Sequence, residues 1–214
     1  MFSKDEQWFI HEGLIDDALV FFNDYFKFKE HPFTKEDAFV LGNFQLSLKL
    51  ESVLYRSLKM PESEYYRMNP MEFWKNLIKT MTQTHYVTYM EFINNIIRLR
   101  AESVLDFGGG SGYLSYLLSQ FGFNVTYSEV NLLALSWMRF LRAKYNLRID
   151  IIDLYTDKIT KKYDVVICKD VVEHTENPKE MIDTLLSYSN KKLLFCPDKS
   201  VPEDWLPMHR EFSL

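Results

Sequence analysis

The chain has 214 residues, which is enough for one well-buried core with a small appendage but too few for two full-sized domains. Hydrophobic residues make up 47% and charged residues 26%, as in an ordinary globular protein. A net charge of -5 argues against nucleic acid as a partner, and no apolar run reaches the length needed to span a membrane. The first residues carry acids and no long apolar stretch, so we expect no signal peptide.

The two cysteines, Cys168 and Cys196, fall in apolar runs that are far apart in the sequence. This pattern is typical of reduced, buried thiols and predicts a cytoplasmic location rather than a disulfide framework.

Residues 1–100 carry helical patterns and form the first expected region. Apolar side chains recur at helical spacing over residues 6–26, and Thr34 with Asp37 resembles a capping box that opens a helix through about Met60. Asn69-Pro70 predicts the start of another helix that runs, with a break, to about Leu99. We expect this region to be a lid or substrate cap. Helices packed behind the core, or used for dimerisation, are the alternative.

Residues 101–214 form the second expected region, in which strands alternate with helices. This alternation predicts an α/β fold with a doubly wound, mostly parallel sheet. Ligands of such sheets bind beyond the carboxyl ends of the strands. The expected strands are residues 104–107, 124–129, 149–152, 164–168 and 192–196, and the expected helices are 113–121, a segment capped by Asn131, and 178–189.

A cluster of glycines, Gly108, Gly109, Gly110 and Gly112, follows the first expected strand and opens a helix. Glycine is needed where a chain turns sharply or touches a ligand, and the amides at a helix start can receive an anionic group. The Gly-Lys-Ser/Thr of a Walker loop is absent, and Tyr113 stands where the dinucleotide fingerprint needs glycine. What remains is the pattern Asp-x-Gly-x-Gly-x-Gly, with Asp106 at the strand end. A ligand with an amino acid carboxylate, an ammonium and an adenosine would suit this acid beside the backbone amides.

Two further acids end strands of this expected sheet. Glu129 ends the second strand, where a carboxylate can accept hydrogen bonds from both ribose hydroxyls of a nucleoside. Asp153 ends the third and could accept from the adenine amino group. Solvated strand-end carboxylates are the alternative for both.

Three stretches, VLDFGGGSG, VTYSEVN and YDVVICKDVVEHTENP, together resemble the class I S-adenosylmethionine (SAM) dependent methyltransferase superfamily, in its small-molecule branch. HREFS at 209–213 is similar to a segment that often follows the fifth strand there. The resemblance implies a Rossmann-like core and SAM as cofactor. It further implies contacts of the methionine end with Asp106, Gly108, Gly110 and Gly112, of the ribose with Glu129, of the adenine with Asp153, and of the sulfonium region with residues 169–171, which include Asp170.

The chain departs from that superfamily after the fifth strand. Members usually continue with a helix and two further strands, whereas only eighteen residues follow Cys196. We therefore expect either that the sequence is a fragment, truncated at its C-terminus, or that the sheet has only about five strands.

Methyl transfer from a sulfonium mainly requires that the acceptor be held in line with the departing sulfur, and a base is needed when the acceptor is protonated. His174 is the candidate catalytic base by position, with capping or packing of the next helix as the alternative. His85, Tyr86 and Tyr89 could face the methyl group or simply pack. No metal-binding cluster is seen in the sequence, and none is expected.

Acidic charge and the aromatic helical region favour a small organic acceptor. A protein or RNA methyltransferase and a non-catalytic SAM-binding scaffold remain the alternatives. Association into a homo-oligomer stays open.

Overall fold

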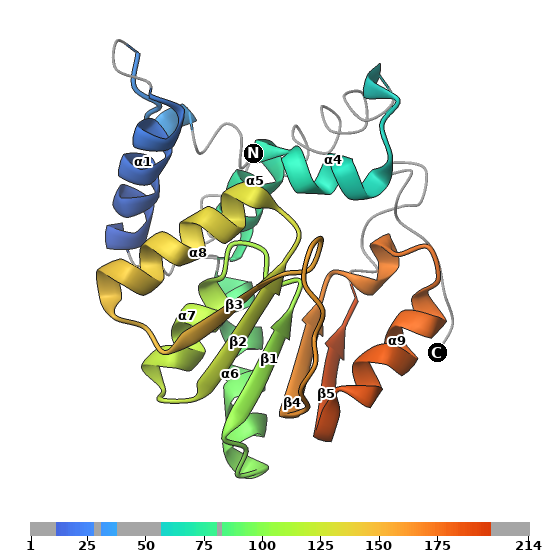
Figure 1. Ribbon diagram of the computed structural model, residues 1–214. Helices are drawn as coiled ribbons and strands as arrows, with labels where there is room; N and C mark the ends of the chain where they lie inside the picture. Colours follow the sequence, from blue (N-terminus) through green and yellow to red (C-terminus); the bar gives the residue numbers. More distant parts are fainter. Residues whose placement is uncertain (1–11, 28–30, 38–56, 81–82, 198–214) are drawn as a thin grey trace.

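The computed structural model describes residues 12–27, 31–37, 57–80 and 83–197 (Figure 1). At its centre is a parallel sheet of five strands in the order β3-β2-β1-β4-β5. This order confirms the predicted doubly wound architecture, because the chain moves outward from β1 to one edge and then crosses to the other. The strands are β1 (Ser103–Phe107), β2 (Asn124–Glu129), β3 (Ile149–Asp153), β4 (Tyr163–Lys169) and β5 (Ser189–Cys196).

The central strands β1 and β4 form because short runs of largely apolar residues are buried on both faces. Val104 packs into one hydrophobic cluster and its neighbour Leu105 into another, and both are fully buried. Alternate residues of a strand point to opposite faces, so β1, β4 and β5 supply both clusters, whereas β2 and β3 supply the larger one. The connecting helices are α7 (Tyr113–Gln120), α8 (Leu132–Tyr145) and α9 (Pro178–Ser187), with a short 3₁₀ turn, η1 (Val172–His174), after β4.

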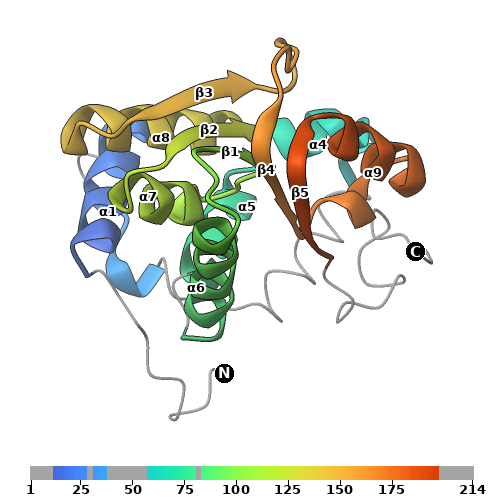
Figure 2. The same cartoon turned by 90° about the horizontal axis from the view of Figure 1, so that it is seen from below.

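The helices divide unequally between the two faces (Figure 2). The larger cluster joins the sheet to α7, α8 and N-terminal helices, and the smaller one joins it to α9. Figure 2 shows α6 and α7 on one side of the sheet and α9 on the other, next to β5.

The described N-terminal helices are α1 (Glu12–Phe26), α4 (Glu62–Met68), α5 (Pro70–Thr80) and α6 (Gln83–Arg98). The predicted start at Pro70 is confirmed, and α5 and α6 are helical as predicted, while the junction between them at residues 81–82 lies outside the described residues. Helix α1 packs on α8, where Phe21 lies 5.6 Å from Trp137 between ring centroids. The larger cluster includes side chains of α1, α5 and α6, so these helices share the core of the sheet.

The capping box at Thr34 is confirmed, because the Asp37 carboxylate accepts from the Thr34 amide at 2.9 Å and the Asp37 amide donates to the Thr34 hydroxyl at 3.2 Å. Most of the helix predicted after it lies outside the described residues, as does the HREFS segment. Helix α4 was not predicted as a separate element.

Asn131 fixes the start of α8 and joins it to the N-terminal helices. Its side-chain oxygen accepts from the amides of Leu133 and Ala134 at 3.1 and 3.0 Å, which satisfies amides that a helix start otherwise leaves unpaired. Its side-chain nitrogen donates to the carbonyls of Tyr66 and Asn69 at 2.8 and 2.9 Å. One buried amide therefore places the end of α4 directly over the carboxyl end of β2.

Candidate active site

A cavity of about 750 Å³ lies at the carboxyl edge of the sheet, where ligands of such folds bind. This volume falls within the range of small-molecule sites, about 300–1,000 Å³. The glycine turn after β1, the ends of β2 and β4, and helices α4 and α5 all contribute to its wall. Of the residues predicted for a site, the cavity is lined by Asp106, Gly108, Gly110, Glu129, Asp170 and His174, and not by Gly112 or Asp153.

The glycine turn needs glycine for two different reasons. Gly110 has a φ of +55° and borders the cavity, and a Cβ atom there would meet no atom nearer than 3.7 Å. Gly112 has a φ of +72°, and a Cβ atom there would lie 2.1 Å from the Met138 methyl group. Gly110 therefore keeps the cavity open, whereas Gly112 lets the turn pack against α8. The predicted ligand contact of Gly112 has no support from this geometry.

The amides of the turn are used inside the protein. Gly109 donates to the Ser128 carbonyl at 3.0 Å, Gly110 to the Glu129 carboxylate at 2.7 Å, and Gly112 to the Gly109 carbonyl at 2.9 Å. The expectation that amides of this turn receive an anion therefore has no support from the geometry of these three and stays a prediction. These hydrogen bonds hold the turn against β2, so the turn borders the cavity as a fixed stretch of backbone.

Asp106, at the end of β1, is 4% exposed and accepts a hydrogen bond of 2.6 Å from the Ser115 hydroxyl. The pKa of this carboxyl is raised from 3.8 to about 6, chiefly by burial and also by the nearby Glu129, against the opposing effect of the Ser115 hydrogen bond. A buried carboxylate at a cavity wall is unfavourable without a cation. Asp106 is therefore suited to a positively charged group of a ligand.

Glu129, at the end of β2, is 7% exposed and accepts from three backbone amides. One oxygen accepts from Gly110 at 2.7 Å, and the other from Val130 and Asn131 at 2.7 and 3.0 Å. Burial raises the pKa of this carboxyl, and these three hydrogen bonds oppose that rise. Because each carboxylate oxygen can accept more than one bond, Glu129 still has acceptor capacity toward the cavity.

Asp153, at the end of β3, pairs with a helix instead of facing the cavity. Its two oxygens accept from the two terminal nitrogens of Arg67 on α4 at 2.8 and 3.0 Å. The Arg67 guanidinium also lies 4.3 Å from the centre of the Tyr155 ring. The Arg67 hydrogen bonds lower the pKa of Asp153 and keep it charged. In this geometry Asp153 holds α4 against the end of β3. The predicted contact of Asp153 with adenine has no support from this arrangement.

Asp170 follows β4 and has a φ of +54°, a conformation that is uncommon for a residue with a side chain. Its carboxylate forms an ion pair with Lys79 of α5 at 3.2 Å and a second one with Lys169. All three residues line the cavity. This pairing joins α5 to the end of β4, beside the position that the sequence predicts for the sulfonium.

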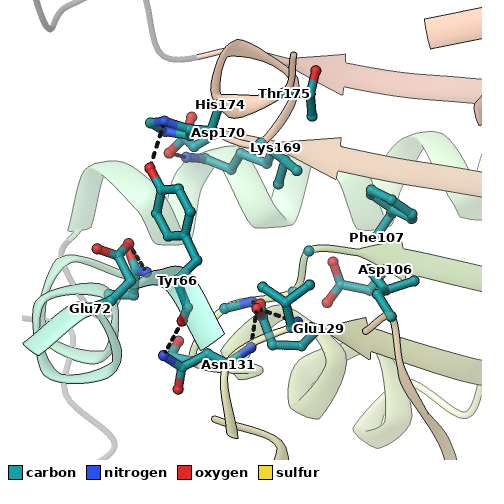
Figure 3. Close-up of a pocket in the computed structure, with 18 of the residues that line it drawn as sticks. Tyr66, Glu72, Asp106, Phe107, Glu129, Asn131, Lys169, Asp170, His174 and Thr175 are labelled. Carbon is teal, nitrogen blue, oxygen red and sulfur yellow. Dashed lines mark hydrogen bonds and ion pairs between the residues drawn. The ribbon is translucent and has the colours of Figure 1, made fainter. Parts of the chain in front are cut away.

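His174, the predicted base, ends η1 and lines the cavity. Its Nδ1 atom lies 2.9 Å from the Tyr66 hydroxyl of α4, and the two rings meet edge to face at 5.5 Å. Figure 3 shows Tyr66 between Asn131 on one side of the cavity and His174 on the other.

Helix α5 adds a polar wall that sequence reasoning missed. Glu72 accepts from Asn76 at 2.7 Å and from Lys75 at 2.5 Å, and all three side chains border the cavity. Their spacing of three and four residues places them on one helix face, which is the signal that could have found them. Of the aromatic candidates on α6, Tyr89 lines the cavity and is 4% exposed, whereas His85 and Tyr86 do not line it.

Within the described ranges, no group of three histidine, cysteine or acidic side chains could hold a metal ion. No helix of that part of the chain is long and apolar enough to cross a membrane.

Residues 74–202 match the family described as a methyltransferase domain, which covers more than half of the 214 residues. The chain belongs to this methyltransferase family. The match confirms the resemblance to class I SAM-dependent methyltransferases and contains the glycine turn, Glu129 and His174.

Relatives of this methyltransferase domain include two O-methyltransferases of ubiquinone biosynthesis. The protein of Rickettsia felis is 34% identical over 128 residues, which are 58% of this chain and 46% of the relative. The protein of Rickettsia bellii is 29% identical over 123 residues, which are 56% of this chain and 46% of the relative. The chain thus spans about half the length of these relatives.

Among solved structures, magnesium protoporphyrin IX methyltransferase from Synechocystis PCC 6803 with bound SAH (S-adenosylhomocysteine) is similar to this methyltransferase domain at a TM-score of 0.46. The two sequences are 26% identical, over 52% of this chain and 54% of the other.

Proposed function

We propose that this methyltransferase domain binds SAM in the cavity and transfers its methyl group to a small organic acceptor. The observation that carries the proposal is the joining of the glycine turn to Glu129 in one wall of a cavity that α4 and α5 also border. Residues of the turn, of β2 and of β4 thereby surround a space of the right size for a nucleoside ligand and an acceptor.

The residues present fit SAM at three points. Gly110 leaves room for the ligand against the turn, and the buried Asp106 suits the ammonium of the methionine end. Glu129 has acceptor capacity for the ribose hydroxyls. Bound SAM supplies a reactive methyl group on a sulfonium, so the protein needs chiefly to position the acceptor and to exclude water.

The helices over the cavity favour a small acceptor over a protein or an RNA. Tyr66 crosses the cavity from the β2 side to the β4 side, and α5 closes the side beside the glycine turn. The names of the relatives make a hydroxyl group the first acceptor to test.

Calorimetry with SAM and SAH, followed by assays of SAH formation over a panel of phenols, alcohols, amines and carboxylic acids, tests the proposal. We expect binding of both ligands and turnover with members of one acceptor class. Binding without turnover over the panel would favour a non-catalytic SAM-binding protein, and turnover only with protein or RNA would favour those acceptors.

We further propose that the domain works in the cytoplasm. Cys168 is buried and Cys196 partly buried, and neither forms a disulfide, as is usual in a reducing compartment. Self-association stays a prediction.

A further inference from the structure

We propose that Tyr66 is a positioning residue for His174, which acts as the base toward a hydroxyl acceptor. This proposal rests on the proposed function and adds a residue of the N-terminal region to the reaction. It begins from the 2.9 Å contact between the Tyr66 hydroxyl and His174 Nδ1.

Tyr66 is held from both ends. Its backbone carbonyl accepts from the Asn131 side chain at 2.8 Å, and its hydroxyl meets His174 across the cavity (Figure 3). Asn131 is itself fixed because it caps α8. The hydroxyl therefore lies at a defined place relative to the sheet.

His174 is held at its backbone in the same way. Its amide donates to the Val171 carbonyl at 2.9 Å, and its neighbours Val172 and Glu173 are 0% and 1% exposed. The Tyr66 hydrogen bond and ring contact act on the imidazole itself and restrict its rotation about the side-chain bonds. Because Nδ1 is engaged by Tyr66, Nε2 is the nitrogen that would serve an acceptor.

A hydroxyl is suited to this task because it can both donate and accept. Toward a protonated imidazole, the Tyr66 oxygen accepts from Nδ1–H. Toward a neutral imidazole, the hydroxyl either accepts in the same way or donates to Nδ1. In the Nδ1–H form the Tyr66 oxygen accepts from Nδ1–H both before and after Nε2 takes up a proton. Tyr66 can therefore keep the ring in one orientation through the step.

The reaction balances with this arrangement. An oxygen lone pair of the acceptor forms the bond to the methyl carbon, and the electrons of the carbon–sulfur bond remain on sulfur. The proton of the acceptor hydroxyl passes to Nε2 of His174, which requires the Nδ1–H form in which Tyr66 accepts. Charged residues of the same cavity wall are Lys169 at the end of β4, Asp170 after it, Lys79 of α5 and Glu176, and Glu173 precedes His174 in η1.

The test compares Tyr66→Phe with Tyr155→Phe, which removes a hydroxyl from an exposed ring outside the cavity wall. The first readout is the ¹⁵N spectrum of His174 in the SAH-bound protein, assigned by its loss in His174→Gln. We expect well-separated Nδ1 and Nε2 shifts in the wild type and in Tyr155→Phe, and converging shifts in Tyr66→Phe as tautomers and orientations mix. Identical spectra in all three proteins would overturn the proposal.

The second readout is turnover with an acceptor that the panel identifies. We expect kcat of Tyr66→Phe to fall about tenfold or more, with KM and SAH affinity nearly unchanged, because general-base catalysis contributes roughly 10²–10⁴-fold. A variant with a lower melting temperature but an unchanged kcat would show a structural role and contradict the proposal. Absence of SAH binding in the wild type would instead refute the proposed function. The ¹⁵N comparison on the unliganded protein would still test whether Tyr66 fixes the tautomer and orientation of His174.

Discussion

The Gly110 amide donates to the Glu129 carboxylate at 2.7 Å, so the centre of the glycine turn and the acid at the end of β2 form one unit. A change in either residue should therefore affect the position of the other. Matched variants of each residue separate ligand contact from this structural coupling.

Replacing Gly110 by valine should abolish SAH binding, because the new side chain would enter the open cavity beside Asn76. The matched control is Gly122→Val. Gly122 also has a positive φ, +87°, but a Cβ atom there would meet no atom within 4 Å, and the residue lies outside the cavity wall. Because φ is positive at both positions, each variant carries backbone strain of order 1 kcal/mol or more. Calorimetry that finds equal SAH affinities in the two variants would show that Gly110 does not border the ligand.

Replacing Glu129 by alanine should lower SAH affinity at least about tenfold, since a hydrogen bond to a charged group contributes roughly 1.5–3 kcal/mol. The change also leaves the amides of Gly110, Val130 and Asn131 without their acceptor, so the melting temperature should fall. Comparison of SAH with its 2′-deoxy analogue separates the two effects. The mutation should lower the affinity for the deoxy ligand far less than the affinity for SAH. Equal losses of affinity for both ligands would show that Glu129 has a structural role and does not bind the ribose hydroxyls.

Binding of SAH should weaken below about pH 6, because the ammonium of the ligand prefers the charged form of Asp106, whose pKa is raised to about 6. The loss should approach about tenfold per pH unit in the acid range. Calorimetry from pH 5 to pH 8 measures it, and Asp106→Asn should give a weaker but flatter profile. The same profile in wild type and variant would remove Asp106 from the ligand site.

The raised pKa of Asp106 also predicts that this carboxyl lowers the stability of the folded protein as the pH rises, whereas the affinity for SAH increases over the same range. Its folded-state pKa of about 6 lies above the unfolded value of 3.8, so the folded protein binds more protons between them. The contribution of this carboxyl to stability is therefore present at low pH and is lost as the pH rises through about 6. Asp106→Asn should melt at a higher temperature than the wild type at pH 7.5. A lower melting temperature there would contradict this sign.

The ion pair of Arg67 with Asp153 should dock α4 without contacting SAM. Arg67→Met would leave a partly buried carboxylate without its partner, at a cost of roughly 1–3 kcal/mol. Hydrogen exchange should speed up over residues 62–68, while SAH affinity changes less than about twofold. Because the pKa of Asp153 is lowered, this contribution exists at neutral pH and is lost as the pH falls through the acid range. A large loss of SAH affinity in Arg67→Met would contradict this prediction and favour the contact of Asp153 with adenine.

The lid expectation can be measured in the same experiment. If α4 and α5 close over the ligands, exchange over residues 62–80 should slow when SAH and an acceptor bind together. Equal protection with and without ligands would rule out a lid.

The sheet could be predicted from sequence because the central strands β1 and β4 are local apolar runs and the starts of α8 and α9 carry local side-chain caps. Asn131 is one example, since its cap of α8 depends only on residues two and three positions later. The position of the site followed from the glycine turn and the strand ends. Both are patterns of adjacent residues.

The partners of the site residues could not be predicted, because they are set by packing between distant segments. Tyr66 meets His174 across 108 residues, and Arg67 meets Asp153 across 86. The same carboxylate can bind a ligand or dock a helix, and only the fold decides between these roles. For this reason the strand-end position of Asp153 pointed to adenine, and nothing in the sequence indicated its pairing with α4.

A crystal structure of the protein grown with SAH would test the central proposal most directly. We expect SAH between the glycine turn and helix α5, with its ammonium near Asp106 and its ribose hydroxyls within hydrogen-bonding distance of Glu129. A structure with SAH bound elsewhere, or with Glu129 still bonded only to backbone amides beside an ordered ligand, would contradict it.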